Sequence, residues 1–484
     1  MTPYPYVNLL LFIAFILITI RVAVKVILDT QNSTKTLAYL LIIFFLPFIG
    51  IIIYFTFGMN YRKNKLYKKK LFKNKELRDR LRQWAYTETS ENQELYATTI
   101  GNKQGLVSLL LKDSFSPLSN TNSVELLING EQKFPVVLNA LEQAEQYIHI
   151  EYYIYDDDEI GNLIKDLLIR KAKAGVTVRL IYDDFGSHGI KKKIVKELRD
   201  GGVDARPFYE IKFFFLANRY NYRDHRKTII VDGKVGFIGG INISDKYIND
   251  RPKPLFWRDT HLKISGECIY SLQYLFISNW NFCCDNELDL VPEFFPPVRN
   301  QHNKLVQIVG SGPDSDRASI MLSFFTAIAT AQTELFITSP YFVPNESILD
   351  AIKKAALSGV DVRILVPGIS DSRFVNFASR AYYGELLMAG VRIFLYKKGF
   401  IHAKTIAADD NLSIVGTANM DLRSFDLNFE AVAVIYDQQI NKQLKASFHN
   451  DVKDSEEILV DEWMKRSKWI VLTEAIAKLV SPIL

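Results

Sequence analysis

Two long apolar runs open the chain, separated by a short polar stretch. The first covers about residues 7–28 with Arg21 and Lys25 near its end, and the second covers about residues 37–57 without a charge. A helix rises about 1.5 Å per residue, so about 20 apolar residues cross the hydrocarbon core of a bilayer. The second run has this length, and the first reaches it if both basic side chains extend to the interface. The pattern predicts a two-helix transmembrane hairpin over residues 1–58.

A cleaved signal peptide is the alternative interpretation of the first run. Such a peptide needs a basic start and a cleavage site made of small residues. Residues 1–8 contain no Lys or Arg, and no Ala-x-Ala follows the run. The sequence therefore favours an anchor that is retained.

After the anchor, the apolar pattern occurs twice in the same order. The first copy has a strand-like stretch at 144–150, a helix-periodic stretch at about 160–174 and a further apolar stretch that begins after Gly175. The second copy repeats this order, with its helix at about 347–357 and the corresponding Gly at Gly359. A strand, a helix that ends at Gly and a second strand form a βαβ unit. The predicted fold class is therefore α/β, with two mixed α/β domains in a pseudo-twofold arrangement.

Prolines and weak patterning indicate where these domains begin and end. Residues 291–300 lie between the copies and include two adjacent prolines, which predicts a first domain at 119–295 and a second at 304–484. Residues 83–118 are weakly patterned and are predicted to be a linker. Together with the preceding basic residues they form a juxtamembrane segment and linker at 59–118.

The positive charge of the chain is concentrated next to the anchor. The formal net charge is +5, yet residues 59–82 hold eleven Lys or Arg and two acids, which leaves the rest of the chain near −4. A basic block beside an apolar segment indicates a membrane surface and not a nucleic acid partner. Because basic loops remain in the cytoplasm, the catalytic domains are predicted to be cytoplasmic and the protein multi-pass.

The cysteines suggest neither a disulfide framework nor a metal site. There are three, Cys268, Cys283 and Cys284, and two of them are adjacent. No Cys-x-x-Cys pair and no His/Cys cluster occur, so a zinc or iron site is not expected.

Both copies also contain the same set of chemically active residues. Each reads His-x-Lys-x-x-x-x-Asp, with a Gly fourteen and an Asn seventeen residues after the His. Five positions that match twice in register indicate a duplicated active site. The residues are His225, Lys227, Asp232, Gly239 and Asn242 in the first copy, and His402, Lys404, Asp409, Gly416 and Asn419 in the second.

The spacing suits chemistry at phosphorus. On a strand, residues two apart lie on one face, so the His and Lys of each motif can point at one ligand. Lys is a point charge for phosphate oxygens, and His is a nucleophile or a general acid near neutral pH. Two such pairs facing each other suit an in-line attack in which one His bonds to phosphorus and the other protonates the leaving oxygen. The Lys and Asn side chains would stabilise charge on the equatorial oxygens.

Four acidic residues have different predicted tasks. Asp259 and Glu430 are candidates to accept a bond from one imidazole nitrogen each, which fixes the tautomer and raises basicity. Asp232 and Asp409 are followed by Gly233 and Asp410, residues that are typical of turns. We therefore interpret the role of Asp232 and Asp409 as structural more than chemical.

These residues resemble the paired HKD motifs of the phospholipase D superfamily over roughly residues 119–484. More narrowly, the chain is similar to bacterial cardiolipin synthases, and its apolar N-terminus is similar to the anchor of that family. The segments that carry the resemblance are Asp224–Lys227, Gly239–Asn242, Trp257–Asp259, Ser339–Pro344, Gly416–Asn419 and Arg423–Glu430, with Leu46–Gly50 and Tyr54–Gly58 in the anchor.

The resemblance implies an activity and a location. In that family two phosphatidylglycerol molecules yield cardiolipin and glycerol through a phosphohistidine, without a nucleotide or metal cofactor, at the bacterial inner membrane. The HKD residues of both motifs would be catalytic, and the first-motif histidine, His225, would be the nucleophile. One departure is Gly240, which stands where the second motif has Thr417.

Other activities of the superfamily use the same residues. A hydrolytic phospholipase D or another phosphatidyltransferase differs in its acceptor, which the motifs do not reveal. A nuclease would gain nothing from an anchor, and an inactive scaffold would be expected to lack some of the four His and Lys residues.

The last residues, 463–484, mix Trp, Lys and apolar residues at helical spacing. This pattern fits a helix in the membrane interface and fits equally a helix packed against the second domain.

Overall fold

The computed structural model describes residues 5–29, 33–55, 74–209, 222–250, 253–284, 286–298 and 302–480. It divides into two compact units, one at the N-terminus and one that holds both copies of the repeat. The most basic part of the predicted juxtamembrane segment, residues 62–73, lies outside the described residues.

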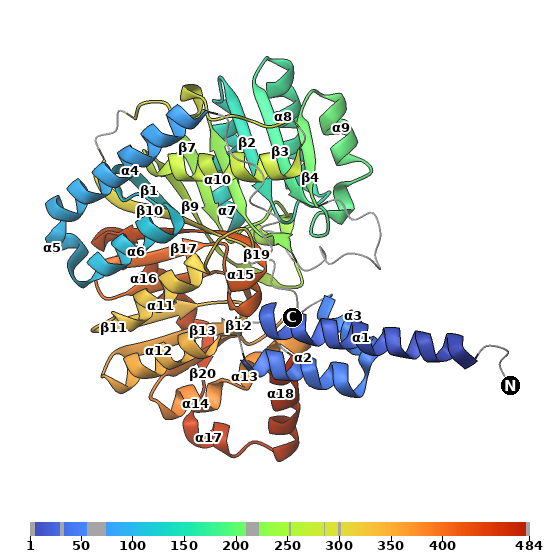
Figure 1. Cartoon of the computed structure of the whole chain (residues 1–484). Helices are drawn as coiled ribbons and strands as arrows, with labels where there is room; N and C mark the ends of the chain where they lie inside the picture. Colours follow the sequence, from blue (N-terminus) through green and yellow to red (C-terminus); the bar gives the residue numbers. More distant parts are fainter. Residues whose placement is uncertain are drawn as a thin grey trace. The chain divides into compact units, whose positions relative to one another are not determined.

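The first apolar run folds as the long helix α1, Pro5–Asp29 (Figure 1). Its segment Tyr6–Asp29 has a mean hydropathy of 2.6 and, among the described residues, is the one helix long and apolar enough to cross a membrane. The second run forms two shorter helices, α2 (Ser33–Phe45) and α3 (Pro47–Ile53).

The break between α2 and α3 lies at Leu46, whose backbone is not helical (φ −136°). Proline disfavours a helical conformation in the residue before it and is well suited to begin the next helix. The second run is therefore two short helices instead of one continuous helix, and the predicted two-helix hairpin is not confirmed. α2 and α3 pack so closely that a Cβ on Gly50 would lie 2.6 Å from the Cα of Ile43. The Tyr54 hydroxyl at the end of this run donates to Asp29 at the end of α1 over 3.0 Å.

The larger unit is built on one long mixed sheet that contains both repeats. The strand order β4-β3-β2-β6-β7-β9-β1 in the first half corresponds to β14-β13-β11-β16-β17-β19-β10 in the second. The halves join where β1 pairs with β10 in antiparallel fashion, so a pseudo-twofold axis passes between these strands (Figure 1). The first-half strands are β1 Ser119–Ile128, β2 Tyr147–Tyr152, β3 Thr177–Asp183, β4 Asp204–Phe208, β6 Lys227–Val231, β7 Val235–Gly239 and β9 Thr260–Ser265. Those of the second half are β10 Lys304–Ser311, β11 Glu334–Thr338, β13 Asp361–Pro367, β14 Arg392–Tyr396, β16 Thr405–Ala408, β17 Leu412–Gly416 and β19 Asn428–Tyr436, with β20 Ser455–Glu457 at the edge.

The two predicted βαβ helices are present. They are α8, Glu159–Lys173, and α12, Glu346–Leu357. Asp158 and Asn345 cap their first turns by accepting from the amides of the third residue on, each over 3.0 Å. The chain leaves both helices through a glycine at positive φ, as the Gly-terminated pattern predicted. The other helices of the sheet layers are α7 Asn129–Glu142, α9 Ile194–Asp200, α10 Cys268–Cys283, α11 Ser319–Ala329, α14 Tyr383–Met388 and α16 Gln438–Lys453.

The stretch predicted as a linker is instead helical and part of the core. It forms α4 (Lys75–Leu95), α5 (Ala97–Ile100) and α6 (Gln104–Ser114). Leu106 and Leu110 of α6 are fully buried in the cluster that includes β10 and α11 of the second half. The prediction failed because these apolar residues face a partner more than 190 residues away in sequence, which a local pattern does not reveal.

Candidate active site

The two motif histidines lie where the halves meet, and each backbone is held by the opposite half. β5 (Arg223–Asp224) pairs with the start of β19, and the His225 amide donates to the Phe429 carbonyl over 2.9 Å. Likewise β15 (Gly399–Ile401) pairs with β8 (Phe256–Arg258), and the His402 amide donates to the Arg258 carbonyl over 2.7 Å. Each histidine therefore depends on both halves for its position.

The orienting carboxylates are also exchanged between halves. Nδ1 of His225 lies 2.9 Å from Oε1 and 3.0 Å from Oε2 of Glu430. Nδ1 of His402 lies 2.7 Å from Oδ2 of Asp259. Both carboxylates are fully buried. Because Nδ1 of each ring faces a carboxylate, Nε2 of each is left for a ligand in the cavity.

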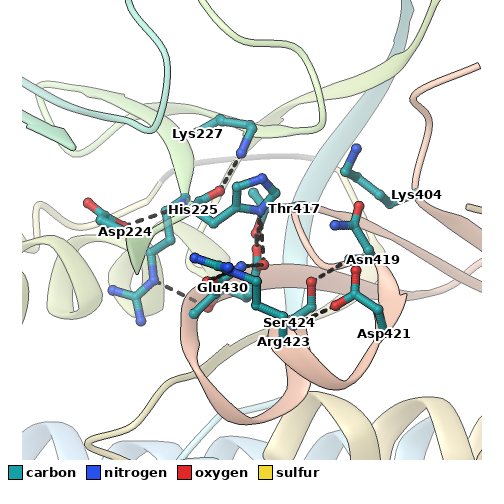
Figure 2. Close-up of polar contacts among 12 residues, drawn as sticks. Asp224, His225, Lys227, Lys404, Thr417, Asn419, Asp421, Arg423, Ser424 and Glu430 are labelled. Atoms are coloured by element: carbon teal, nitrogen blue, oxygen red, sulfur yellow. Dashed lines mark hydrogen bonds and ion pairs between the residues drawn. The ribbon is translucent and has the colours of Figure 1, made fainter. Parts of the chain in front are cut away.

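The two lysines adopt the same arrangement in both motifs. The ammonium groups of Lys227 and Lys404 each donate to the carbonyl of the His two residues earlier, over 2.5 Å in both cases. Figure 2 shows the imidazole ring of His225 between the two lysine side chains. An ammonium group has three donors, so each lysine keeps donors for an anion.

Burial shifts the pKa values of these groups in the direction that removes charge. It lowers the pKa of His225 to about 4, although Glu430 opposes the shift. The pKa of His402 is also well below its usual range because of burial and the nearby lysines. Burial lowers the pKa of Lys227 to about 7 and that of Lys404 to about 8. A buried site in which two histidines and two lysines have lowered pKa values is suited to an anionic ligand. The negative charge of that ligand would raise these pKa values again.

The two asparagines line the same cavity but have different partners. Asn242 donates to the Tyr247 hydroxyl over 2.8 Å and accepts from the Ile154 amide over 3.2 Å. Asn419 is buried, and among the described residues its Oδ1 has no hydrogen-bond partner. A buried polar atom without a partner is costly, which fits a position that a ligand completes.

The aspartates of the two motifs do not lie with the histidines and lysines. Asp232 and Asp409 adopt left-handed backbone conformations, with φ of 52° and 50°, at the turns after β6 and β16. The Asp232 carboxylate accepts from three backbone amides at 145–147, each over 2.8 Å. Asp409 accepts from the amides of Gln332 and Thr333 over 2.8 Å. These contacts are with backbone amides away from the histidines, so we keep a structural role for both aspartates as our prediction.

A cavity of about 320 Å³ opens over the two histidines. Several of its wall residues were given no role from the sequence: Tyr153, Arg223, Lys246, Tyr247, Tyr341, Asp371, Asp421 and Arg423. Arg223 had a detectable signal, since it precedes His225 by two residues and therefore continues the alternation that places His225 and Lys227 on one face. Tyr341 lies within Ser339–Pro344, one of the segments that carry the resemblance, whereas Asp371 had no signal. A hydrogen bond of 2.6 Å brings the two together from separate loops.

A duplicated α/β fold that carries two His-x-Lys motifs, with both motif histidines lining one cavity, defines the class of phospholipase D-like enzymes. Residues 137–252 and 324–452 match the family model described as cardiolipin synthase, PLD-like domain. Residues 10–58 match the model described as Phospholipase_D-nuclease N-terminal. The chain belongs to the phospholipase D-like cardiolipin synthase family, whose members are phosphatidyltransferases.

Relatives of full length support this membership. The chain is 39% identical over 482 residues to the major cardiolipin synthase ClsA of Bacillus subtilis, covering 99% of each chain. It is 40% identical to a cardiolipin synthase of Geobacillus sp., over 96% of this chain and 91% of the relative. A phosphatidylserine synthase from Haemophilus influenzae has a similar solved structure, with a TM-score of 0.59 and 15% identity over 80% of this chain and 100% of that one. This last similarity shows the fold alone.

Proposed function

We propose that the protein is a cardiolipin synthase that transfers a phosphatidyl group between two phosphatidylglycerol molecules and releases glycerol. The observation that carries the proposal is the pair of histidines in one cavity, each bonded to a carboxylate of the other half. The family membership and the full-length relatives named as cardiolipin synthases support the choice of substrate.

The first step forms a bond between Nε2 of His225 and the phosphorus of one phosphatidylglycerol. The bond from phosphorus to the head-group glycerol breaks, and His402 gives that oxygen a proton. His402 carries this proton in the complex, because the anionic phosphate of the bound lipid raises its pKa above that of the free site. Lys227, Lys404 and the Asn side chains stabilise the charge on the remaining oxygens. Burial keeps the pKa of His225 at about 4, so its nitrogen is unprotonated and nucleophilic at neutral pH.

The second step transfers the phosphatidyl group from His225 to the second lipid. A hydroxyl of a second phosphatidylglycerol gives its proton to His402 and attacks phosphorus, and the phosphorus–nitrogen bond breaks to restore His225. The products are cardiolipin and glycerol. Burial raises the pKa of Asp259 to about 6, which suits a carboxyl that supports proton exchange at His402.

The direct test uses the purified full chain in vesicles of phosphatidylglycerol, with lipid products separated by mass. Cardiolipin together with an equal amount of glycerol is expected. Phosphatidic acid as the main product would replace the synthase with a hydrolytic phospholipase D. Cardiolipin formed with phosphatidylethanolamine as donor would indicate a different phosphatidyltransferase.

The domain organisation proposed for this function follows the predicted boundaries. Residues 1–58 are the anchor, 59–118 carry the basic segment and the helices that pack on the second half, and 119–295 and 304–484 are the two halves of the catalytic unit. We place the catalytic unit in the cytoplasm of a bacterial cell, because the basic residues after the anchor remain on that side.

The anchor could cross the membrane in two ways, and a contact of Tyr54, just after α3, favours one of them. A second span would carry residue 55 to the opposite side from Asp29, whereas the Tyr54–Asp29 hydrogen bond brings them together. We therefore propose that α1 crosses the membrane and that α2 and α3 enter and return on the cytoplasmic side. Single cysteines near Asn8 and near residue 31 distinguish the two. Labelling of the first but not the second by an impermeant thiol reagent supports the returning helices, and the opposite result restores the two-span hairpin.

A further inference from the structure

Two helices beside the cavity expose their large apolar residues, whereas helices on the surface of a water-soluble protein bury them. They are α13 (Arg373–Arg380) and α18 (Lys468–Val480), which pack against each other. A surface helix in water normally buries its large apolar residues and exposes its polar ones. In α18 the residues that are almost fully buried are Glu474 and Ala477, each 2% exposed.

The large apolar residues of these helices face outward. Trp469, Leu472, Ile476 and Leu479 are 77%, 49%, 52% and 79% exposed and recur at the spacing of one helix face. On α13, Phe374 and Phe377 are 38% and 36% exposed, three residues apart. These six residues are called the outer apolar face.

Ion pairs of Glu474 hold α18 in this orientation, together with the small apolar contact of Ala477. The buried Glu474 accepts from Arg380 of α13 over 2.8 Å and from Arg466 over 2.8 Å. Arg466 also lies over the ring of Trp463, 3.3 Å from its centre. Because Glu474 has two arginine partners on the inner side, rotation of the helix to bury its apolar residues would leave these charges unpaired. The exposure of the apolar face is therefore built into the packing.

The outer apolar face adjoins the cavity. Val375 of α13 and Asp371, just before that helix, line the cavity wall that also contains Tyr341. Exposed basic residues, Arg373, Lys465 and Lys468, flank the apolar residues. Trp and Lys beside an apolar helix face are typical of a segment that lies in the interface of an anionic bilayer.

We infer that α13 and α18 form a bilayer-docking surface that inserts the outer apolar face into the membrane interface and brings the cavity to the lipid head groups. The lipid chemistry rests on the proposed function: the phosphate must reach His225 while the acyl chains remain in the bilayer. The choice of a bilayer over a protein partner rests on the flanking basic residues and on the adjacent cavity.

The test measures where α18 lies, independently of catalysis. In the full chain, Cys268, Cys283 and Cys284 are replaced by Ala, and a spin label is attached to Leu472→Cys or to Ile476→Cys. The control is Leu357→Cys, because Leu357 on α12 is an apolar residue that is 74% exposed outside this surface. Accessibility to oxygen and to a water-soluble nickel chelate is measured in vesicles of phosphatidylglycerol and phosphatidylethanolamine.

The inference predicts a ratio of oxygen to nickel accessibility several-fold higher at positions 472 and 476 than at 357. Equal ratios at all three positions would overturn it. Labels shielded from both reagents would also overturn it, since they would show a protein cover such as α1–α3 or a second copy.

A kinetic comparison links this surface to lipid access. The double variant L472Q/I476Q should turn over phosphatidylglycerol in vesicles several-fold more slowly, with an unchanged rate on a water-soluble nitrophenyl phosphodiester and an unchanged melting temperature. Leu357→Gln is the matched control and should change neither rate. An equal loss on both substrates would assign these residues to folding and overturn the docking role. If the labels report insertion but the protein is inactive on phosphatidylglycerol, the proposed function is refuted and the docking surface is retained.

Discussion

The two histidines occupy equivalent positions in the repeat, yet their surroundings differ. Glu430 faces His225 with both oxygens and also accepts from Thr417 over 2.5 Å and from Asn428 over 3.2 Å. Asp259 faces His402 with one oxygen, and its other oxygen accepts from the Thr260 amide over 2.7 Å. The Tyr247 hydroxyl lies 3.5 Å from Nδ1 of His402, and in the described part of the chain no tyrosine hydroxyl makes this contact with His225.

One position accounts for much of this difference. A Cβ on Gly240 would lie 2.2 Å from Oδ1 of Asp259, so a side chain at this position would displace the carboxylate. At the corresponding position the Thr417 hydroxyl binds Glu430, accepts from the Ala431 amide and is fully buried. The duplicated motif thus supplies equivalent geometry, while Gly240 and Thr417 make the two carboxylates chemically unequal. We interpret the firmly held pair as the nucleophile and the pair with the raised Asp259 pKa as the proton carrier.

The largest expected effect is the loss of either motif histidine. His225→Ala and His402→Ala should each lower turnover of phosphatidylglycerol by at least ~10²–10⁴-fold. A nitrophenyl leaving group departs without a proton, so His402→Ala should regain activity on a nitrophenyl phosphodiester and accumulate a phosphohistidine. His225→Ala should give no adduct, because the attacking nitrogen is absent.

Mass mapping of the trapped adduct measures this difference between the halves. Phosphorus on His402 in the His225 variant would reverse the two roles. His188→Ala removes an exposed histidine of the first half and should behave like the unaltered protein.

The next largest effect comes from the Gly240 and Thr417 positions. Gly240→Thr should displace Asp259 from His402 and lower turnover about 10–100-fold, the range seen for lost orienting partners. Thr417→Val removes one hydrogen bond to Glu430, worth about 1 kcal/mol, and should lower turnover about fivefold. Thr417→Ser retains the hydroxyl and should stay close to the unaltered rate.

These variants should leave the melting temperature within a few degrees of the unaltered protein. A Gly240→Thr variant of normal activity would contradict the proposed dependence of His402 on Asp259. Equal losses for Gly240→Thr and Thr417→Val would contradict the inequality of the two halves.

A smaller effect concerns the pH dependence of kcat/KM, which reports the free enzyme. As pH rises through about 7–8, Lys227 with its pKa of about 7 and Lys404 with its pKa of about 8 lose their protons, and the rate should fall. As pH falls through about 6, Asp259 gains a proton and no longer accepts from His402, which should also lower the rate.

His225, with its pKa of about 4, should impose no limit above pH 5. The measurement is a pH profile on phosphatidylglycerol in vesicles, with Lys227→Arg as the comparison. Because a guanidinium stays protonated, this variant should lower the rate but shift the alkaline fall to higher pH. A profile that stays flat to pH 9 would show that neither lysine needs its proton in the free enzyme.

The smallest effect on turnover is expected at the aspartates behind the motifs. Asp409 binds Lys103, a fully buried residue whose ammonium group lies 2.8 Å from Oδ2. Among the residues that the structure describes, Asp232 has backbone amides as its hydrogen-bond partners. Lys103→Met should lower the free energy of unfolding by about 1–3 kcal/mol, since it leaves a partly buried carboxylate without its cation. The rate per folded molecule should not change.

Thermal unfolding followed by circular dichroism measures this loss, with Lys112→Met on the exposed side of α6 as the control. A large loss of turnover at full stability would return Asp409 to the catalytic residues. Such a result would also bring Asp232 back into consideration.

The sequence by itself determined the local elements and the list of reactive residues. The helices at Glu159–Lys173 and Glu346–Leu357 follow from apolar periodicity, a capping side chain and a terminal glycine, all of which act within a few residues. The register of His225 with His402 follows from the duplication alone. Family membership follows from these motifs together with the length over which the relatives match.

Tertiary structure decided which residues meet. Glu430 is 205 residues from His225, and Asp259 is 143 residues from His402. Their exchange between halves therefore depends on how β1 and β10 join the two halves of the sheet. The same holds for α6, whose apolar residues find their partners in the second half, and for α18, whose orientation depends on Arg380. Local patterns fix which face of an element is apolar, but the partner of that face is selected by the free energy of the whole assembly, and no window of sequence contains that information.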